Sequence, residues 1–293
     1  MQNIHCVPGG KIMSYKIIVD SCGELTQKMK RKGIYSSAPL SMEVDGDRIV
    51  DDETFDQADF LKRVAASPEC PKSSCPSPEK YMELYDGEEE RVYAVTLSAE
   101  LSGSYNSAQL GKDLWMEEHA GQEKSIYVFN SRSASVGETL IACKIEECEE
   151  KGMSFDEVVS AVEAYIAGQH TYFVLENLDT LRKNGRLTGI KSLVASALNI
   201  KPVMGSTPEG KICQLGQARG MKRALAKMAD QIAADGENTK NKVLAISHCN
   251  CPEWAREMGR MIKDKIPVKS SFIVDTAGIS SMYANDGGII VVL

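Results

Sequence analysis

The sequence lacks several features that would place it in a specialised class of proteins. It has no apolar run near the roughly 18–20 residues that a membrane-spanning helix requires. Its 34 lysines and arginines are outnumbered by 41 aspartates and glutamates, which gives a formal net charge of -7. Because proteins that bind nucleic acid through its phosphates usually carry an excess of basic residues, we do not expect nucleic acid as a partner.

Disulfide frameworks, metal centres and secretion signals are also absent. The nine cysteines are odd in number and dispersed, which favours free thiols in a reducing cytoplasm. With only four histidines, the sequence contains no convergent Cys and His pairs of the kind that hold zinc. The start, MQNIHCVPGGKIM, has neither a basic beginning nor an apolar core, so it is not a secretory signal. We expect a cytoplasmic protein without a metal ion.

The motifs of common enzyme classes are missing as well. No Gly-x-Ser-x-Gly turn is present, and no glycine-rich dinucleotide loop or phosphate-binding lysine follows a strand. Serines and threonines are frequent, but without a neighbouring base a hydroxyl is a weak nucleophile and a good hydrogen-bonding group. The sequence therefore disfavours a hydrolase and a nucleotide-dependent enzyme, and we expect a ligand-binding protein without a cofactor.

Short apolar segments alternate with amphipathic helical ones over most of the chain, which predicts an α/β fold. Their enrichment in Val, Ile, Tyr and Phe is typical of strands. The seven expected strands are Lys16–Val19, Arg91–Leu97, Ser125–Phe129, Thr171–Leu175, Lys242–Ser247, Ser270–Val274 and Gly288–Leu293. Helix starts are marked by Ser77-Pro78 and by a capping box at Ser154–Glu157.

The regular alternation of strand and helix segments breaks after about residue 170. A hairpin signal appears there, with Lys201–Met204 and Lys211–Leu215 on either side of a Thr-Pro-Glu-Gly turn. Hairpins imply antiparallel pairing. We therefore predict an N-terminal extension over residues 1–12, a first α/β domain with a parallel sheet over 13–168, and a second domain with a mixed or antiparallel sheet over 169–293.

Hydroxyl-rich turns stand out at the ends of the expected strands and the starts of helices. They are Asp20-Ser21 and the segments 72–78, 97–105 and 130–135. Any one of these serines could simply cap its own helix. Together, at the carboxyl edge of a parallel sheet where helix N-termini gather, they would form a donor-rich pocket suited to an anion.

These same segments resemble the DegV family of bacterial fatty acid-binding proteins, from Met13 almost to the end of the chain. Seven ordered segments carry the resemblance: IIVDSCGEL, KSSCPSPEKY, TLSAELSGSYNSA, FNSRSASVG, FVLENLDTLRKNGRL, KPVM and QARGMKRAL. The resemblance implies two α/β domains that hold one fatty acid between them, and a protein that presents the acid to a fatty acid kinase.

The resemblance also implies residue roles. The ligand carboxylate would be held by the hydroxyls of Ser73 and Ser98, with Ser102 and Gly103 supporting the second. Arg219, in the Arg-Gly-x-Lys segment, would act in the step that forms acyl-phosphate with the partner kinase. The acyl tail needs an apolar tunnel, for which the segments 193–198 and 279–282 are candidates, although apolar helix faces are usually ordinary core.

The sequence departs from the family pattern at four positions. Ser73 replaces a threonine, Cys75 a glutamine and Asn130 an aspartate, while Tyr283 stands where the family has a histidine. A tyrosine hydroxyl can still donate to a carboxylate, so Tyr283 is expected to contribute to binding. Two alternatives stay open: a binder of another amphiphilic carboxylate, or a phosphotransferase component related to dihydroxyacetone kinases, which the absence of phosphate loops disfavours.

Overall fold

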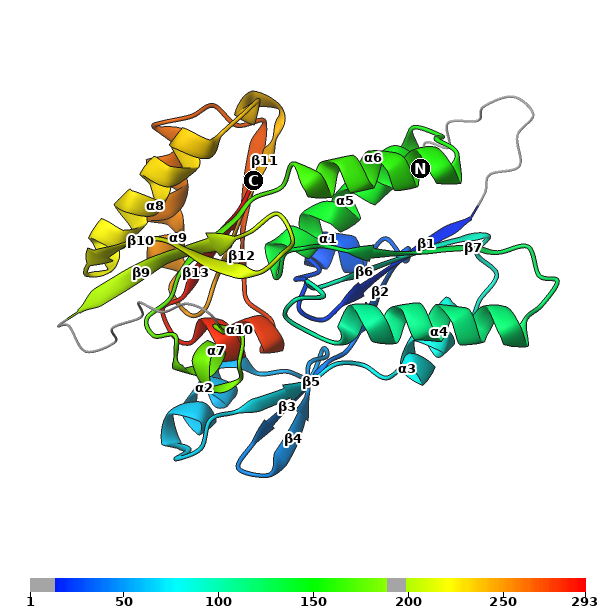
Figure 1. The fold of residues 1–293 in the computed structure, drawn as a ribbon, viewed down its shortest axis with the longest axis horizontal. Coiled ribbons are helices and arrows are strands. Elements are labelled where there is room, and N and C mark those ends of the chain that lie inside the picture. Colours follow the sequence, from blue (N-terminus) through cyan, green and yellow to red (C-terminus); the bar gives the residue numbers. More distant parts are fainter. Residues whose placement is uncertain (1–13, 189–198) are drawn as a thin grey trace.

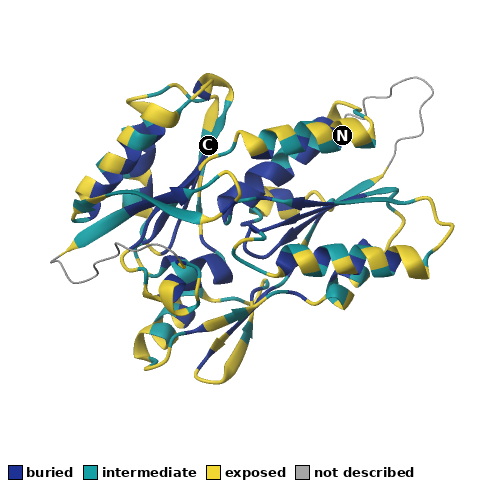
Figure 2. Cartoon of the chain, viewed as in Figure 1, coloured by how far each residue is buried: buried dark blue, intermediate teal, exposed yellow. Residues whose placement is uncertain are grey.

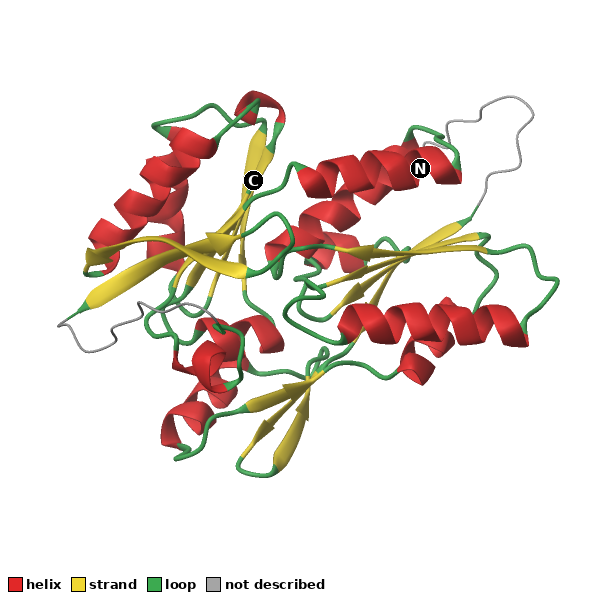
Figure 3. Ribbon diagram, in the orientation of Figure 1, coloured by secondary structure: helices red, strands yellow, loops and turns green. Residues whose placement is uncertain are grey.

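Two main β-sheets form the framework of the protein, and a smaller third sheet lies below them in Figure 1. The computed structural model describes residues 14–188 and 199–293. None of the helices in these two ranges is long and apolar enough to cross a membrane. Helices enclose both main sheets, as the ribbon coloured by secondary structure shows (Figure 3).

The first main sheet has four parallel strands in the order β2-β1-β6-β7. The strands are β1 (Tyr15–Asp20), β2 (Tyr35–Ala38), β6 (Arg91–Thr96) and β7 (Ser125–Asn130). The helices of this part are α1 (Gln27–Lys30), α3 (Pro78–Tyr85), α4 (Ser104–Glu118), α5 (Val136–Glu150) and α6 (Phe155–Ala167). Because all four strands run the same way, the turns after β1, β6 and β7 meet at one edge.

Between β2 and α3 the chain forms a small antiparallel sheet in the order β4-β3-β5. Its strands are β3 (Ser41–Val44), β4 (Asp47–Val50) and β5 (Lys72–Ser74), and α2 (Gln57–Ala66) connects the last two. The sequence did not reveal this sheet, because strands of three or four residues are too short for alternation of apolar and polar side chains to stand out. Ser73, expected in a turn, therefore lies on a strand.

The second main sheet has six strands in the order β10-β9-β8-β13-β11-β12, and only β11 and β12 pair in parallel. The strands are β8 (Thr171–Val174), β9 (Ile200–Ser206), β10 (Ile212–Arg219), β11 (Val243–His248), β12 (Ser270–Asp275) and β13 (Ile289–Val292). The remaining helices are α7 (Asp179–Lys183), α8 (Met221–Asp235), the 3-10 turn η1 (Thr239–Asn241), α9 (Pro252–Lys263) and α10 (Gly278–Ala284).

Buried residues, dark blue in Figure 2, lie on both faces of the two main sheets. Helices α5 and α6 cover one face of the four-stranded sheet, and α3 and α4 cover the other. Helices α8 and α9 cover one face of the six-stranded sheet. On its opposite face Val136 and Leu140 of α5 pack against Ala245 and Val292, so α5 contacts both sheets. Helix α10 packs against the small sheet through Ile279 and Met282.

The predicted fold class is confirmed: the first sheet is parallel, the second is mixed, and the seven strands and the hairpin are present. The caps at Ser77 and Ser154 also form as expected. The predicted boundary near residue 168 falls between α6 and β8 and stays a prediction. The predicted extension over residues 1–12 and the candidate tunnel segment 193–198 lie outside the described residues.

Candidate functional site

A cavity lies between the two main sheets and opens to solvent on one side. The space in it that a water-sized molecule can occupy is about 100 Å³. Its wall is mainly apolar, with Leu97 and Leu101 from the first half of the chain and Phe173, Ile212 and Ile279 from the second. Both halves are needed to form it. The cavity thus has the place and the lining expected for the tail of an amphiphile.

The charged side chains among the described lining residues of the cavity are all positive. Arg132 and Arg186 are the charged side chains among its described lining residues. Arg186 is held in place because its Nε donates to the Leu101 carbonyl at 3.1 Å and its Nη1 donates to the Asn184 carbonyl at 2.7 Å. Its guanidinium carbon lies 5.5 Å from the centre of the Tyr283 ring, within the range of a cation–π contact.

Ser73 and Tyr283, two of the predicted binding residues, are in direct contact. The Ser73 Oγ and the Tyr283 hydroxyl are 2.9 Å apart, although 210 residues separate them in the chain. Tyr283 lies on α10 and lines the cavity, while Ser73 lies on β5 behind it. Burial raises the pKa of Tyr283, so the hydroxyl keeps its proton and can donate to an anion at neutral pH.

Ser98 lies behind the cavity wall rather than in it. It is fully buried after β6, and its Oγ donates to the Gly210 carbonyl at 2.9 Å. Gly210 lines the cavity and ends the hairpin turn between β9 and β10. It has a φ of +93°, and a Cβ there would lie 2.3 Å from the Ser98 Oγ, so the hairpin turn approaches Ser98 this closely only with glycine.

The other predicted residues lie farther from the cavity lining. The Ser102 Oγ accepts from the Ser104 amide at 3.2 Å, and Gly103 is the N-cap of α4 beside the Cys75 thiol. Arg219 is exposed at the end of β10, just before α8, and it is not among the residues that line the cavity. Its position suits contact with a macromolecular partner rather than with a ligand inside the cavity.

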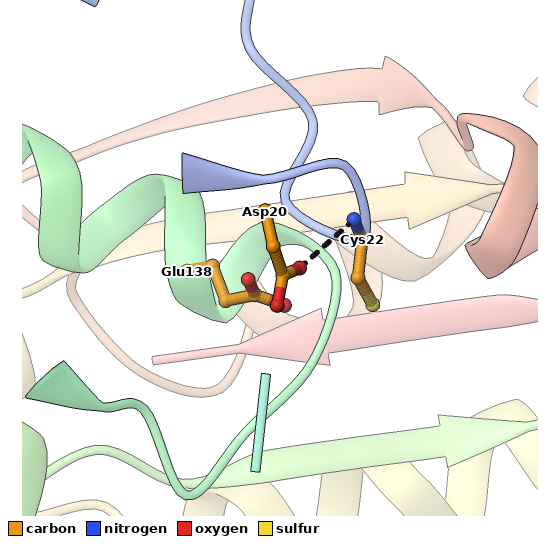
Figure 4. A group of neighbouring side chains, drawn as sticks. All are labelled: Asp20, Cys22 and Glu138. Carbon is orange, nitrogen blue, oxygen red and sulfur yellow. Dashed lines mark hydrogen bonds between the residues drawn. The ribbon is translucent and has the colours of Figure 1, made fainter. Parts of the chain in front are cut away.

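Buried carboxyl groups gather next to the cavity, at the end of β1 and the start of α5. One oxygen of Asp20, one of Glu138 and the Cys22 thiol lie within 4.8 Å of one another (Figure 4). Burial raises the pKa of Asp20, but less than that of Glu138, because Asp20 accepts from the amides of Cys22 and Leu97 and, at 2.6 Å, from the Ser104 hydroxyl. Burial, and then the charge of Asp20, raises the pKa of Glu138 well above its usual range, so Glu138 holds the proton of this pair.

Two further buried carboxyl groups approach α10. The Ser135 hydroxyl lies 2.8 and 3.0 Å from the two carboxylate oxygens of Glu24, and burial raises the Glu24 pKa to about 7. Asp51 accepts from the amides of Gly278 and Ile279 at the start of α10, and burial raises its pKa to about 6. These groups line a separate polar groove rather than the apolar cavity.

The geometry agrees with what is known of related chains. A family model described as "Uncharacterised protein, DegV family" matches residues 14–292. The chain belongs to the DegV family. A DegV domain-containing protein of Streptococcus pneumoniae is 33% identical over 281 residues, which are 95% of this chain and 98% of that protein.

Solved DegV structures share the fold over nearly their full length. A DegV family protein of Ruminococcus gnavus, described with vaccenic acid, is 63% identical with a TM-score of 0.93, covering 96% of this chain and 100% of that one. The Streptococcus pneumoniae Fatty Acid Kinase (Fak) B3 protein loaded with linoleic acid is 31% identical with a TM-score of 0.85, covering 96% and 99%. Members of the DegV family thus bind fatty acids.

The sequence pointed to some residues of this site and missed others. Arg186 lies in the segment FVLENLDTLRKNGRL, which resembles the family, but its position in the sequence does not reveal that its side chain contacts Tyr283. Glu138 and Glu24 gave no signal either, because an acidic residue at the start of a helix or in a turn is ordinarily exposed. The packing of α5 against both main sheets, and of α10 against the small sheet, accompanies their burial.

Proposed function

We propose that this DegV protein binds one long-chain fatty acid, with the tail in the cavity between the sheets and the carboxylate at its polar wall. The observation that carries the proposal is an apolar cavity whose described charged lining residues are the two arginines Arg132 and Arg186. An apolar space with positive charge and no acidic side chain among its described lining residues favours an amphiphilic anion over a neutral lipid.

The energetics of the tail are sufficient for stable retention. A long-chain acid has about 14–16 methylene groups, each contributing about 0.8 kcal/mol when it is removed from water, or about 12 kcal/mol in all. Part of this offsets the ordering of the chain and of the cavity wall. The remainder is enough for the acid to stay bound through purification.

The carboxylate needs compensating hydrogen bonds, and the chain offers hydroxyl donors for them. We assign this role to Ser73 and Tyr283, whose hydroxyls are 2.9 Å apart, and to Ser98, with Ser102 and Gly103 behind it. On binding, Ser98 would exchange its bond to the Gly210 carbonyl for one to the ligand. Each hydrogen bond to a charged group contributes about 1.5–3 kcal/mol.

In this proposal the protein is a carrier, and the chemistry belongs to a partner. A fatty acid kinase would phosphorylate the bound carboxylate to acyl-phosphate in the cytoplasm, and Arg219, exposed at the end of β10, would contact that kinase. The solved Fak B3 relative supports this role. We further propose that the two binding halves are domains of residues 13–168 and 169–293, which hold the ligand between them.

The direct test is the composition of the purified protein. Protein produced in a bacterial host and extracted with organic solvent is expected to yield about one fatty acid per chain by mass spectrometry. Ser73→Ala and Ser98→Ala are each expected to weaken rebinding of oleic acid about 10- to 100-fold after the protein has been stripped. An extract without a stoichiometric acid, together with no rebinding, would refute the proposal.

A further inference from the structure

Helix α10, which carries Tyr283, is fixed at its start by residues from the first half of the chain. The two carboxylate oxygens of Asp51 accept from the backbone amides of Gly278 and Ile279 at 2.7 and 2.9 Å. Asp51 directly follows β4 and is only 3% exposed. A buried carboxylate that accepts from two helix amides forms a strong, charge-assisted contact at the positive end of the helix.

The contact between Asp51 and the start of α10 leaves no space for a side chain at position 278. A Cβ on Gly278 would lie 2.6 Å from the Asp51 Oδ1 and 2.5 Å from the Met42 Cε. The residue is therefore glycine because the small sheet and the start of α10 approach each other too closely for a side chain. Gln57 adds a second tie, because its Nε2 donates to the Thr276 carbonyl at 2.9 Å.

Asp51 directly follows β4 of the small sheet, and Ser73 lies on β5 of the same sheet. The Asp51 amide donates to the Leu40 carbonyl just before β3, and within the sheet Met42 of β3 pairs with Ser73 of β5. The small sheet thus meets α10 at two points, the Asp51 contact at the start of the helix and the Ser73–Tyr283 contact near its end.

We propose that Asp51 is a positioning residue for the fatty acid head group: by fixing the start of α10 on the small sheet, it holds the Tyr283 hydroxyl against Ser73 at the cavity wall. This inference rests on the proposed function. In this proposal the small antiparallel sheet carries Ser73, and Asp51 beside it aligns the helix that carries Tyr283.

Asp51→Asn tests the inference with little change in volume. An asparagine offers one acceptor oxygen and turns its NH2 group toward the second amide, so it replaces a favourable contact with an unfavourable one. At about pH 7.5, stripped D51N is expected to bind oleic acid about 10-fold more weakly than the unchanged protein in isothermal titration calorimetry. Asp52→Asn is the matched control, because the Asp52 carboxylate accepts from Thr54 in the adjoining turn, and its affinity should not change.

A double mutant separates positioning from general destabilisation. Tyr283→Phe removes the hydroxyl that Asp51 is inferred to position, so adding D51N to Y283F should weaken oleic acid binding by less than twofold further. A purely structural role for Asp51 predicts another result, namely a lower melting temperature with unchanged affinity, or an equal loss of affinity with and without the Tyr283 hydroxyl. Either result would overturn the inference.

A replacement variant and a parallel measurement of the unchanged protein complete the test. If D51N does not fold, Gln57→Leu, which removes the neighbouring tie to Thr276, takes its place in the same double-mutant comparison. Oleic acid binding by the unchanged protein, measured in parallel, separates a failure of the proposed function from a failure of the positioning role of Asp51. If the unchanged protein binds no fatty acid, the proposed function fails and the inference fails with it, whereas unchanged binding by D51N refutes only the positioning role.

Discussion

Replacing Glu138 by glutamine is expected to flatten the dependence of stability on pH. Glu138 is fully buried beside Asp20, and burial, followed by the charge of Asp20, raises its pKa well above the usual range. The folded protein therefore keeps a proton that the unfolded chain releases above about pH 4.5. As pH rises between these two pKa values, the unfolded state is favoured and the free energy of unfolding falls.

The magnitude follows from proton linkage. One retained proton lowers the free energy of unfolding by up to about 1.4 kcal/mol per pH unit, or about 2.7 kcal/mol between pH 5.5 and 7.5. At about 2–4 °C per kcal/mol for a chain of this size, the melting temperature falls by up to about 5–10 °C from this group alone. Glutamine has nearly the same shape, can donate to Asp20 and does not titrate, so E138Q should lose this part of the slope.

Thermal unfolding of the stripped protein at pH 5.5, 6.5 and 7.5, at constant ionic strength, measures the slopes. Burial also raises the pKa of Glu24 to about 7 and that of Asp51 to about 6, and both groups titrate in the unchanged protein and in E138Q, so the difference between the two slopes reports on the pair of Glu138 and Asp20. Glu147→Gln, on the exposed side of the same helix, is the control. Lys151 lowers the Glu147 pKa, so its stabilising effect is already complete over this range. Parallel slopes for the unchanged protein and E138Q would refute the assignment of the proton to Glu138.

Two more predictions concern the second half of the chain. Arg219→Ala is expected to leave the fatty acid content unchanged but to slow acyl-phosphate formation by the partner kinase at limiting carrier concentration, and equal rates would remove Arg219 from that step. Gly210→Ala is expected to lower the melting temperature by more than Gly185→Ala does. Both glycines have a positive φ, but only at Gly210 would the new methyl group meet Ser98, at 2.3 Å. Calorimetry of the two variants side by side checks this, and equal losses would show that the contact with Ser98 is unimportant.

The local structure of this protein was largely determined by its sequence. Most strands of the two main sheets are runs rich in β-branched and aromatic residues, although β2 (Tyr35–Ala38) lacks this signal and was not predicted. Helix starts such as Ser154–Glu157 carry their own caps. The motif order also led to the family and to Ser73 and Tyr283 as binding residues. These signals are short-range, because each depends on residues within about one turn of a helix or one strand of one another.

The tertiary structure decided what depends on long-range contact. The pairing of Ser73 with Tyr283, the approach of Gly210 to Ser98 and the capping of α10 by Asp51 each join residues more than 100 positions apart. The raised pKa values of Glu138 and Asp51 follow from burial, which no local pattern reveals, because the same residues in an exposed turn would titrate normally. The sequence thus specified the strands and the chemical groups of the site, whereas the packing of α5 and α10 between the sheets set their distances and their charges.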